Sequence, residues 1–312
     1  MPPSRPALLF PGQGAQFVGM GRDFEESSPA ARRVLDEAHR ASGFDLRGLC
    51  FDGPEDRLAL TEFQQPCVLA VSAAIHAAFA ERVSSRPVCA IGHSLGEYSA
   101  HVAAGSLDVG DAVILVGTRG QAMQRAVAAG VGAMAALLGT DEQTAQAACD
   151  DAGGDVWVAN LNGGGQVVIS GVASAVERAV ASAKQRGVRR AVMLPVSAPF
   201  HCPLMEPAAR AMDEVLRAAA FAPPAFPIIA NVDARPCDDP SRFAALLITQ
   251  ITHRVRFEDC VRTAINMGVD AFIELGPGGK LTGMVSRIAP DIRAVSISSV
   301  RELDEAVAAL QS

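Results

Sequence analysis

The stretch Cys89-Ala90-Ile91-Gly92-His93-Ser94-Leu95-Gly96-Glu97-Tyr98 joins a short apolar run to a Gly-x-Ser-x-Gly box. Residues 88–91 predict a buried strand, and residues 98–104 predict a helix that Gly105 closes. A strand, a tight turn and a helix are the setting in which a nucleophilic serine stands at the top of a sheet. Glycine tolerates the close backbone approach in such a turn, and a helix N-terminus favours developing negative charge. The stretch predicts Ser94 as the nucleophile of acyl chemistry; a plain glycine-rich turn is the alternative.

Length and composition indicate an ordinary globular protein. The chain has 312 residues, of which 49% are hydrophobic and 20% charged, with a formal net charge of −7. This length allows a large core and two subdomains. The acidic balance and the lack of a Lys/Arg-rich run argue against nucleic acid as a partner. We find neither a signal-peptide pattern nor a stretch of transmembrane length, and therefore expect a cytoplasmic protein without a membrane contact.

The cysteines do not suggest a disulfide framework or a metal site. There are seven, an odd number, and no Cys-x-x-Cys occurs among them. We therefore expect no metal and no cofactor, with most cysteines acting as small buried side chains. Cys202, beside His201, is an alternative thiol nucleophile, but Ser94 has the better turn.

Apart from the serine turn and its flanking elements, residues 1–127 predict one strand and several helices. Residues 7–10 read as a buried strand, and the Pro11–Gln16 loop after it could aim backbone N–H groups into an oxyanion hole or be an ordinary turn. We expect helices at about 28–41, 67–82 and 108–127. Arg119 lies within the last of these, and on the pattern alone it reads as a surface residue, since arginines are rarely buried.

The pattern then changes to an inserted β-α-β-β-α-β order. We expect strands at 132–138, 156–160, 166–170 and 190–196, with helices at 141–152 and 173–186. This order is the ferredoxin-like, split-βαβ arrangement. The triple glycine at 163–165 reads as a hairpin turn rather than a phosphate loop, because no Lys-Ser/Thr follows it.

The last third supplies a candidate base. His201 follows a strand end in a proline-punctuated loop at the subdomain junction, and histidine is the usual base for a nucleophilic serine at neutral pH. A helix at about 205–219, a strand at 228–232, a helical stretch through Gln250 and a strand at 271–275 follow. The loop at 276–280 could seat a phosphate, but a simple strand cap is the better interpretation.

Five boxes in order make the sequence recognisable. They are Phe10-Pro11-Gly12-Gln13-Gly14-Ala15-Gln16, Gly92-His93-Ser94-Leu95-Gly96-Glu97-Tyr98, Arg119-Gly120-x-x-Met123, Phe200-His201 and Glu274-Leu275-Gly276-Pro277-Gly278. The ordered set closely resembles the malonyl-CoA:acyl carrier protein transacylase family, including the discrete acyltransferases of polyketide synthases. The resemblance covers essentially the whole chain.

The resemblance implies a fold and a set of site residues. The fold is α/β, with an α/β-hydrolase-like large subdomain (1–128 and 198–312) and an inserted ferredoxin-like small subdomain (129–197). The implied roles are Ser94 as nucleophile, His201 as its general base, the backbone N–H groups of Gln13 and Leu95 as oxyanion hole, Arg119 as receptor of the malonyl carboxylate, and the backbone carbonyl of Gln250 as the group that orients the histidine.

The implied role of Arg119 replaces its interpretation as a surface residue. A planar guanidinium binds a carboxylate bidentately, so it would orient the substrate as well as attract it. The ring of Phe200 would crowd a 2-methyl branch, so we expect malonyl to be preferred over methylmalonyl. The implied reaction is ping-pong transfer of malonyl from malonyl-CoA to the phosphopantetheine thiol of an acyl carrier protein, and we expect a monomer.

Two positions depart from the family pattern. Gly163-Gly164 stands where many relatives carry a proline, which concerns only a hairpin of the small subdomain. Arg254 stands where a proline is frequent, which leaves the loop geometry near His201 open. Candidate basic contacts for an acidic carrier protein are Lys184, Arg189, Arg190 and Lys280.

Two alternative functions share some of these sequence features. A serine esterase or thioesterase of the α/β-hydrolase type orders its triad Ser, acid, His, with the histidine late in the chain. Here a third of the sequence follows His201, and no acidic residue between it and Ser94 stands out. The other alternative is a non-catalytic partner of the carrier protein, against which the intact Ser94, His201 and Arg119 argue.

Overall fold

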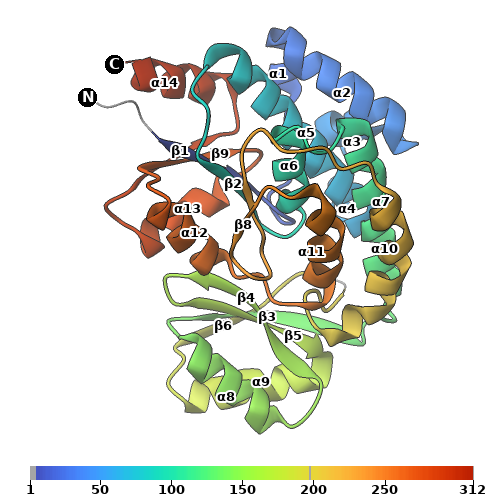
Figure 1. Ribbon diagram of the computed structural model, residues 1–312. Helices are drawn as coiled ribbons and strands as arrows, with labels where there is room; N and C mark the ends of the chain where they lie inside the picture. Colours follow the sequence, from blue (N-terminus) through green and yellow to red (C-terminus); the bar gives the residue numbers. More distant parts are fainter. Residues whose placement is uncertain (1–4, 197, 312) are drawn as a thin grey trace.

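Two sheets organise the chain, and the larger one carries the predicted nucleophile turn (Figure 1). The computed structural model describes residues 5–196 and 198–311. The larger sheet has the order β10-β9-β1-β2-β7-β8, and its pairs are parallel except β7–β8. Its strands are β1 (Pro6–Phe10), β2 (Cys89–Gly92), β7 (Ile228–Ile229), β8 (Pro236–Cys237), β9 (Ala271–Leu275) and β10 (Arg293–Ile297).

Helices cover both faces of this sheet, because side chains alternate between the faces of a strand. Ala7 and Leu9 of β1 join a core cluster with residues of α12 and α13, whereas Leu8 and Phe10 face a larger cluster with residues of α2, α5 and α7. The helices of this part are α1 (Arg22–Ser27), α2 (Pro29–Ser42), α3 (Leu46–Asp52), α4 (Glu55–Leu58), α5 (Thr61–Arg82), α6 (Gly96–Ala103), α7 (Val109–Arg125), α10 (Glu206–Ala218), α11 (Pro240–Thr252), α12 (Phe257–Asn266), α13 (Lys280–Ile288) and α14 (Val300–Gln311).

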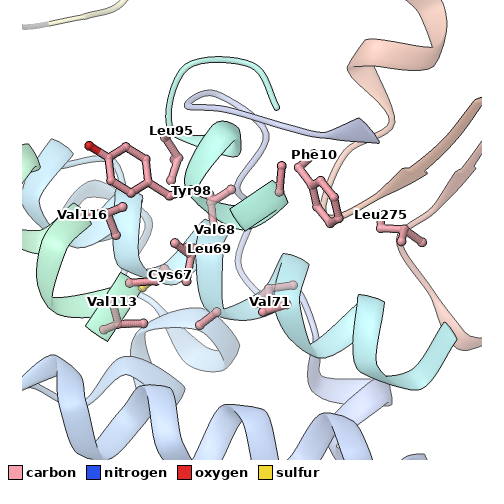
Figure 2. Packing of buried hydrophobic residues seen from close by; sticks show 14 of the residues in the cluster. Phe10, Cys67, Val68, Leu69, Val71, Leu95, Tyr98, Val113, Val116 and Leu275 are labelled. Atoms are coloured by element: carbon pink, nitrogen blue, oxygen red, sulfur yellow. The ribbon is translucent and has the colours of Figure 1, made fainter. Parts of the chain in front are cut away.

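Helix α5 is the central element of the larger cluster. Figure 2 shows its residues Cys67, Val68, Leu69 and Val71 beside Leu95 and Tyr98 of the α6 region and Val113 and Val116 of α7. The prediction that no stretch reaches transmembrane length is wrong for this helix, which is 22 residues long and apolar enough to cross a membrane by length and composition alone. However, 78% of its most apolar window is buried inside the protein, as in the core helix of a globular fold.

The predicted start of α5 is also wrong. We expected a helix from about residue 67, but it begins at Thr61 and contains Pro66. Proline removes one helical hydrogen bond and usually marks a boundary. Here Gln64 and Gln65, which directly precede Pro66, are buried, so tertiary packing stabilises the extra turn.

The smaller sheet confirms the predicted β-α-β-β-α-β order. Its antiparallel order is β4-β5-β3-β6, and α8 and α9 lie on the face away from the larger sheet (Figure 1). The elements are β3 (Gly132–Leu138), α8 (Glu142–Ala152), β4 (Val156–Gly163), β5 (Gln166–Val172), α9 (Ala173–Gln185) and β6 (Arg190–Met193). Gly163 pairs with Gln166, and Gly164 and Gly165 have φ of 57° and 77°, which confirms the hairpin turn.

Two strands are shorter than predicted. β6 ends at Met193 rather than 196, because Pro195 has no N–H for a further ladder bond. β7 ends at Ile229 rather than 232. The Ala230 N–H still donates to the Arg235 carbonyl beside β8, but that of Asn231 leaves the sheet and donates to Glu97 Oε2 at 3.0 Å. This early end of β7 places Asn231 beside the serine turn.

Candidate active site

Ser94 occupies the sharp turn between β2 and α6, as the sequence predicts. Its φ is 55°, in the left-handed region, which non-glycine residues adopt mainly where the surroundings enforce it. A Cβ on Gly92 would lie 1.9 Å from the carbonyl carbon of Gly96, and one on Gly96 would lie 2.1 Å from the Phe10 carbonyl oxygen. The two glycines of the box are therefore required by close backbone packing. The Ser94 N–H donates to Asn231 Oδ1 at 2.8 Å.

The structure brings His201 to this serine across 107 residues of chain. The Ser94 Oγ and His201 Nε2 are 2.7 Å apart, and His201 Nδ1 is 2.9 Å from the Gln250 carbonyl oxygen. Since a carbonyl only accepts, Nδ1 carries the proton, and Nε2 is free to accept from the Ser94 hydroxyl. Burial, followed by the positive charge of Arg119, lowers the pKa of His201 to about 3. The imidazole is thus held neutral, in the state a general base needs.

This environment gives a prediction about pH. A histidine whose folded-state pKa is depressed stays neutral as pH falls, until the pH reaches that lower value. We expect the ring resonances of His201 to show no titration between pH 8 and pH 5 in NMR spectra of the wild-type protein, with His201→Gln used to assign them. A titration midpoint near the ordinary histidine value of about 6.5 would contradict the described environment.

Arg119 is fully buried, which overturns its interpretation as a surface residue from the helical pattern. Its guanidinium donates to Ser94 Oγ at 3.2 Å, to Gln65 Oε1 at 2.7 Å and to Gln250 Oε1 at 3.0 Å. Its Nε has no acceptor among the described residues, and the Tyr98 ring centroid is 5.7 Å from the guanidinium carbon. Burial lowers the pKa of Arg119, although an arginine keeps its charge in proteins. A buried cation thus stands directly behind the serine hydroxyl.

A cavity of about 190 Å³, open to solvent, lies in front of the serine. Of the predicted site residues, Gln13, Ser94, Phe200 and His201 line it, whereas Leu95, Arg119 and Gln250 do not. Strands β3, β4 and β5 of the smaller sheet contribute to its wall, and so do the loops that follow β1 and β2 of the larger sheet. The other lining residues are Pro11, Gly12, Ala15, His93, Met134, Ala136, Asn160, Asn162, Gln166, Val168, Leu194, Val196, Lys280, Leu281 and Met284.

The loop after β1 packs against the serine turn. A Cβ on Gly12 would lie 2.4 Å from the His93 carbonyl oxygen, so the two turns are in backbone contact. The backbone N–H groups of Gln13 and Leu95 have no acceptor within the parts of the chain that the structure describes. The side chain of Gln13 donates to Gln64 Oε1. Two unpaired N–H groups near a nucleophile are what an oxyanion hole requires.

Sequence reasoning missed four polar side chains around these groups. Gln65, Glu97, Asn231 and Asn162 are buried, and the first three bond to Arg119, Gln250 or the serine turn. Asn162 Oδ1 is 2.9 Å from His93 Nε2. The signal in the sequence that could have identified such side chains is a polar residue inside an apolar run, which is uncommon in a buried helix.

The remaining candidates have simpler surroundings. Cys202 is buried, its Sγ contacts the Pro199 carbonyl at 3.1 Å, and burial raises its pKa to about 11, so it is not a thiolate nucleophile. Arg254 pairs with Glu142 on α8. The loop at 276–280 leads into α13, and Lys280 donates to the Gly14 carbonyl at the cavity wall.

A buried serine on a strand–turn–helix, with a neutral histidine at its hydroxyl and backbone N–H groups nearby, defines an acyl-transfer enzyme of the α/β class. Residues 7–299 match the family model of the acyl transferase domain. The chain belongs to this family, and within it to the malonyl-CoA:acyl carrier protein transacylases that its ordered motifs resemble.

Relatives and solved structures agree with this assignment. A malonyl CoA-acyl carrier protein transacylase of Bacillus subtilis is 43% identical over 99% of this chain and 98% of its own length. The crystal structure of an acyl-carrier-protein S-malonyltransferase from Bartonella henselae, 44% identical, superimposes with a TM-score of 0.95 over 99% of this chain and all of that one. A malonyl-transacylase solved in complex with a holo type II polyketide synthase acyl-carrier protein is 39% identical, with a TM-score of 0.95 over 98% of this chain and all of that one.

Proposed function

We propose that the protein moves a malonyl group from malonyl-CoA to the phosphopantetheine thiol of an acyl carrier protein through an ester on Ser94. One observation carries this proposal: a single hydroxyl contacts both a neutral base, His201 at 2.7 Å, and a buried cation, Arg119 at 3.2 Å. A hydrolase for neutral acyl groups has no use for that cation. A carboxylate-bearing acyl group is matched to it.

The geometry supports a dyad mechanism. His201 Nε2 takes the hydroxyl proton as Ser94 Oγ attacks the thioester carbonyl carbon, and the Gln250 carbonyl stabilises the imidazolium through Nδ1–H. The N–H groups of Gln13 and Leu95 stabilise the tetrahedral oxyanion. The carbon–sulfur bond then breaks, and His201 returns the proton to the departing CoA thiol. The carrier-protein thiol attacks the ester by the same steps in reverse order.

Arg119 gains a partner when the ester forms. In the free protein one of its N–H groups donates to the serine hydroxyl, and its Nε has no acceptor among the described residues. The malonyl carboxylate, two bonds beyond the ester carbonyl, supplies two acceptor oxygens for this guanidinium edge. A bidentate pair in this water-excluded place both orients the malonyl group and shields its ester.

The cavity supports a pantetheine arm as the leaving and entering group. It offers the amides of Asn160, Asn162 and Gln166 beside apolar side chains, which suits an arm that alternates amides and methylenes. Lys280, on the opposite wall, is the one of the four basic docking candidates that lines the cavity. We propose residues 129–197 as the small subdomain, which supplies the wall with Asn160, Asn162 and Gln166. We also propose that the protein is cytoplasmic, and that it is a monomer because every site residue comes from one chain.

Phe200 is proposed to set the choice of acyl branch, because its ring lines the cavity next to His201. We expect Phe200→Ala to raise the methylmalonyl-to-malonyl ratio of kcat/KM about tenfold, the effect of room for one methyl group. Competition kinetics with both thioesters measures this ratio. Leu194→Ala removes volume elsewhere in the same cavity and is the matched control; an equal rise in both variants would contradict a special role for Phe200.

Transfer to a carrier protein tests the proposed function. The protein is mixed with malonyl-CoA and either the holo or the apo form of an acyl carrier protein, and malonyl-carrier product is followed by mass spectrometry. We expect product with the holo form alone, since only that form carries the thiol. Free malonate released at the rate of CoA release, with no carrier product, would instead establish a thioesterase.

A further inference from the structure

Glu97 is a buried carboxylate that the proposed mechanism does not use. It lies in the first turn of α6, three residues after Ser94, and is 1% exposed. It does not line the cavity. Its Oε2 accepts from the Asn231 N–H at 3.0 Å and from Gln250 Nε2 at 2.8 Å. Burying a carboxylate costs free energy unless the group is paired, so the presence of this one calls for a structural or functional explanation.

The Gln250 side chain connects this carboxylate to the site. Its Nε2 donates to the Ser94 carbonyl oxygen at 2.9 Å as well as to Glu97, and its Oε1 accepts from Arg119 at 3.0 Å. The amide could rotate by half a turn at little steric cost. The rotated amide would turn its NH2 toward the guanidinium, which only donates, and its oxygen toward a carboxylate, which only accepts. The Glu97 Oε2 and the Ser94 carbonyl oxygen both accept in this network, so together they favour one orientation of the amide.

We propose that Glu97 is a positioning residue for the carboxylate-binding arginine: through the Gln250 amide it holds the Arg119 guanidinium against Ser94. This inference rests on the proposed function and adds to it a determinant of selectivity. Glu97 acts on Arg119 through the Gln250 side chain, whereas His201 is held by the Gln250 backbone carbonyl. Loss of Glu97 is therefore expected to affect carboxylate recognition more than base catalysis.

The charges around Glu97 are consistent with this role. The groups that act on it electrostatically are Arg119 of α7 and Asp233 of the segment after β7, and Glu97 in turn acts on Cys260 of α12. Burial raises the pKa of Glu97 to about 7, while the bonds from Gln250 and Asn231 and the charge of Arg119 oppose that rise. Across one amide, the carboxylate is the counter-charge of the buried guanidinium.

The test measures selectivity rather than overall rate. Single-turnover ester formation on Ser94 is followed for malonyl-CoA and acetyl-CoA in the wild-type protein and in Glu97→Ala, Glu97→Gln and Ser99→Ala. Removing a hydrogen bond to a charged group corresponds to roughly ten- to hundredfold, so we expect Glu97→Ala to lower the malonyl-to-acetyl ratio by at least about tenfold. Glu97→Gln keeps an acceptor oxygen for Gln250 and should recover most of the ratio.

Ser99→Ala is the matched control, because Ser99 is buried in the same helix and its hydroxyl has no partner among the described residues. We expect it to keep the wild-type ratio. If Glu97→Ala slows both thioesters equally, Glu97 only stabilises the fold and the inference is wrong. If the malonyl-to-acetyl ratio of Glu97→Gln is as low as that of Glu97→Ala, residue 97 does not act on Arg119 through its hydrogen bond with Gln250. Failure of the proposed function is distinguishable, since the wild-type protein would then form no malonyl ester.

Discussion

Ser94→Ala is expected to lower malonyl transfer to holo carrier protein by at least about 10⁴-fold, the order seen when a nucleophile that works with a base is removed. The alanine has no oxygen to form the ester, and His201 has no proton to accept. The backbone bond from the Ser94 N–H to Asn231 does not depend on the hydroxyl and should persist. Transfer is measured with malonyl-CoA and holo carrier protein at equal enzyme concentrations.

The stability of this variant provides the control. Its melting temperature should stay within a few degrees of the wild-type value, because Arg119 loses one of three acceptors and keeps Gln65 and Gln250. A folded Ser94→Ala protein that retains more than about a hundredth of the wild-type rate would show that another residue carries the acyl group.

The second large effect is expected at Arg119. Arg119→Ala removes the buried partner of the malonyl carboxylate, a loss of about 3–5 kcal/mol, or roughly 10²- to 5 × 10³-fold in kcat/KM for malonyl-CoA. Acetyl-CoA has no carboxylate to bind the guanidinium, so its kcat/KM should change much less. The ratio of kcat/KM for malonyl-CoA to that for acetyl-CoA should therefore fall, or even drop below one. Competition between the two thioesters measures the ratio directly and is independent of the fraction of folded protein.

Arg119→Lys tests the geometry of this pair. Lysine keeps the positive charge but cannot present a planar, two-pronged edge. We expect this variant to recover only part of the malonyl preference and to leave Gln65 Oε1 or Gln250 Oε1 without its donor. Full recovery by lysine would show that charge alone is recognised; an unchanged ratio in Arg119→Ala would remove Arg119 from substrate recognition altogether.

The local features of the site could be predicted from the sequence because their causes are local. Ser94 was found through the two glycines that the turn requires, and the inserted β-α-β-β-α-β order through strand and helix periodicity. His201 was found through its proline-rich loop, although its 2.7 Å contact with Ser94 depends on packing across the whole fold. The ordered family motifs supplied the remaining roles, which the structure brings together as neighbours.

Features that depend on tertiary packing could not be predicted. Arg119 occupies one position of an ordinary helical pattern, and its burial depends on the amide oxygens that α5 and α11 bring to it. The start of α5 was misplaced because the preference of Pro66 for a helix boundary is overridden by burial. The roles of Glu97 and Asn231 arise from bonds across more than 130 residues, for which a single sequence holds no periodic signal.

Among the residues that the structure describes, no acid binds His201, which separates this site from the esterase alternative. In a Ser-His-Asp triad a carboxylate holds the imidazole and stabilises its cation. Here the Gln250 carbonyl accepts from Nδ1, and the buried carboxylate of Glu97 accepts from Gln250 Nε2 instead. The negative charge of the site is thus paired with Arg119 across an amide, which leaves the guanidinium edge for the acyl group.

The most direct test is the intact mass of the protein after brief exposure to malonyl-CoA without a carrier protein, followed by peptide mapping. The structure predicts a gain of one malonyl group on Ser94, lost on addition of holo carrier protein and absent in Ser94→Ala. CoA release with no mass gain, or a malonyl group mapped to another residue, would contradict the acyl-enzyme on Ser94.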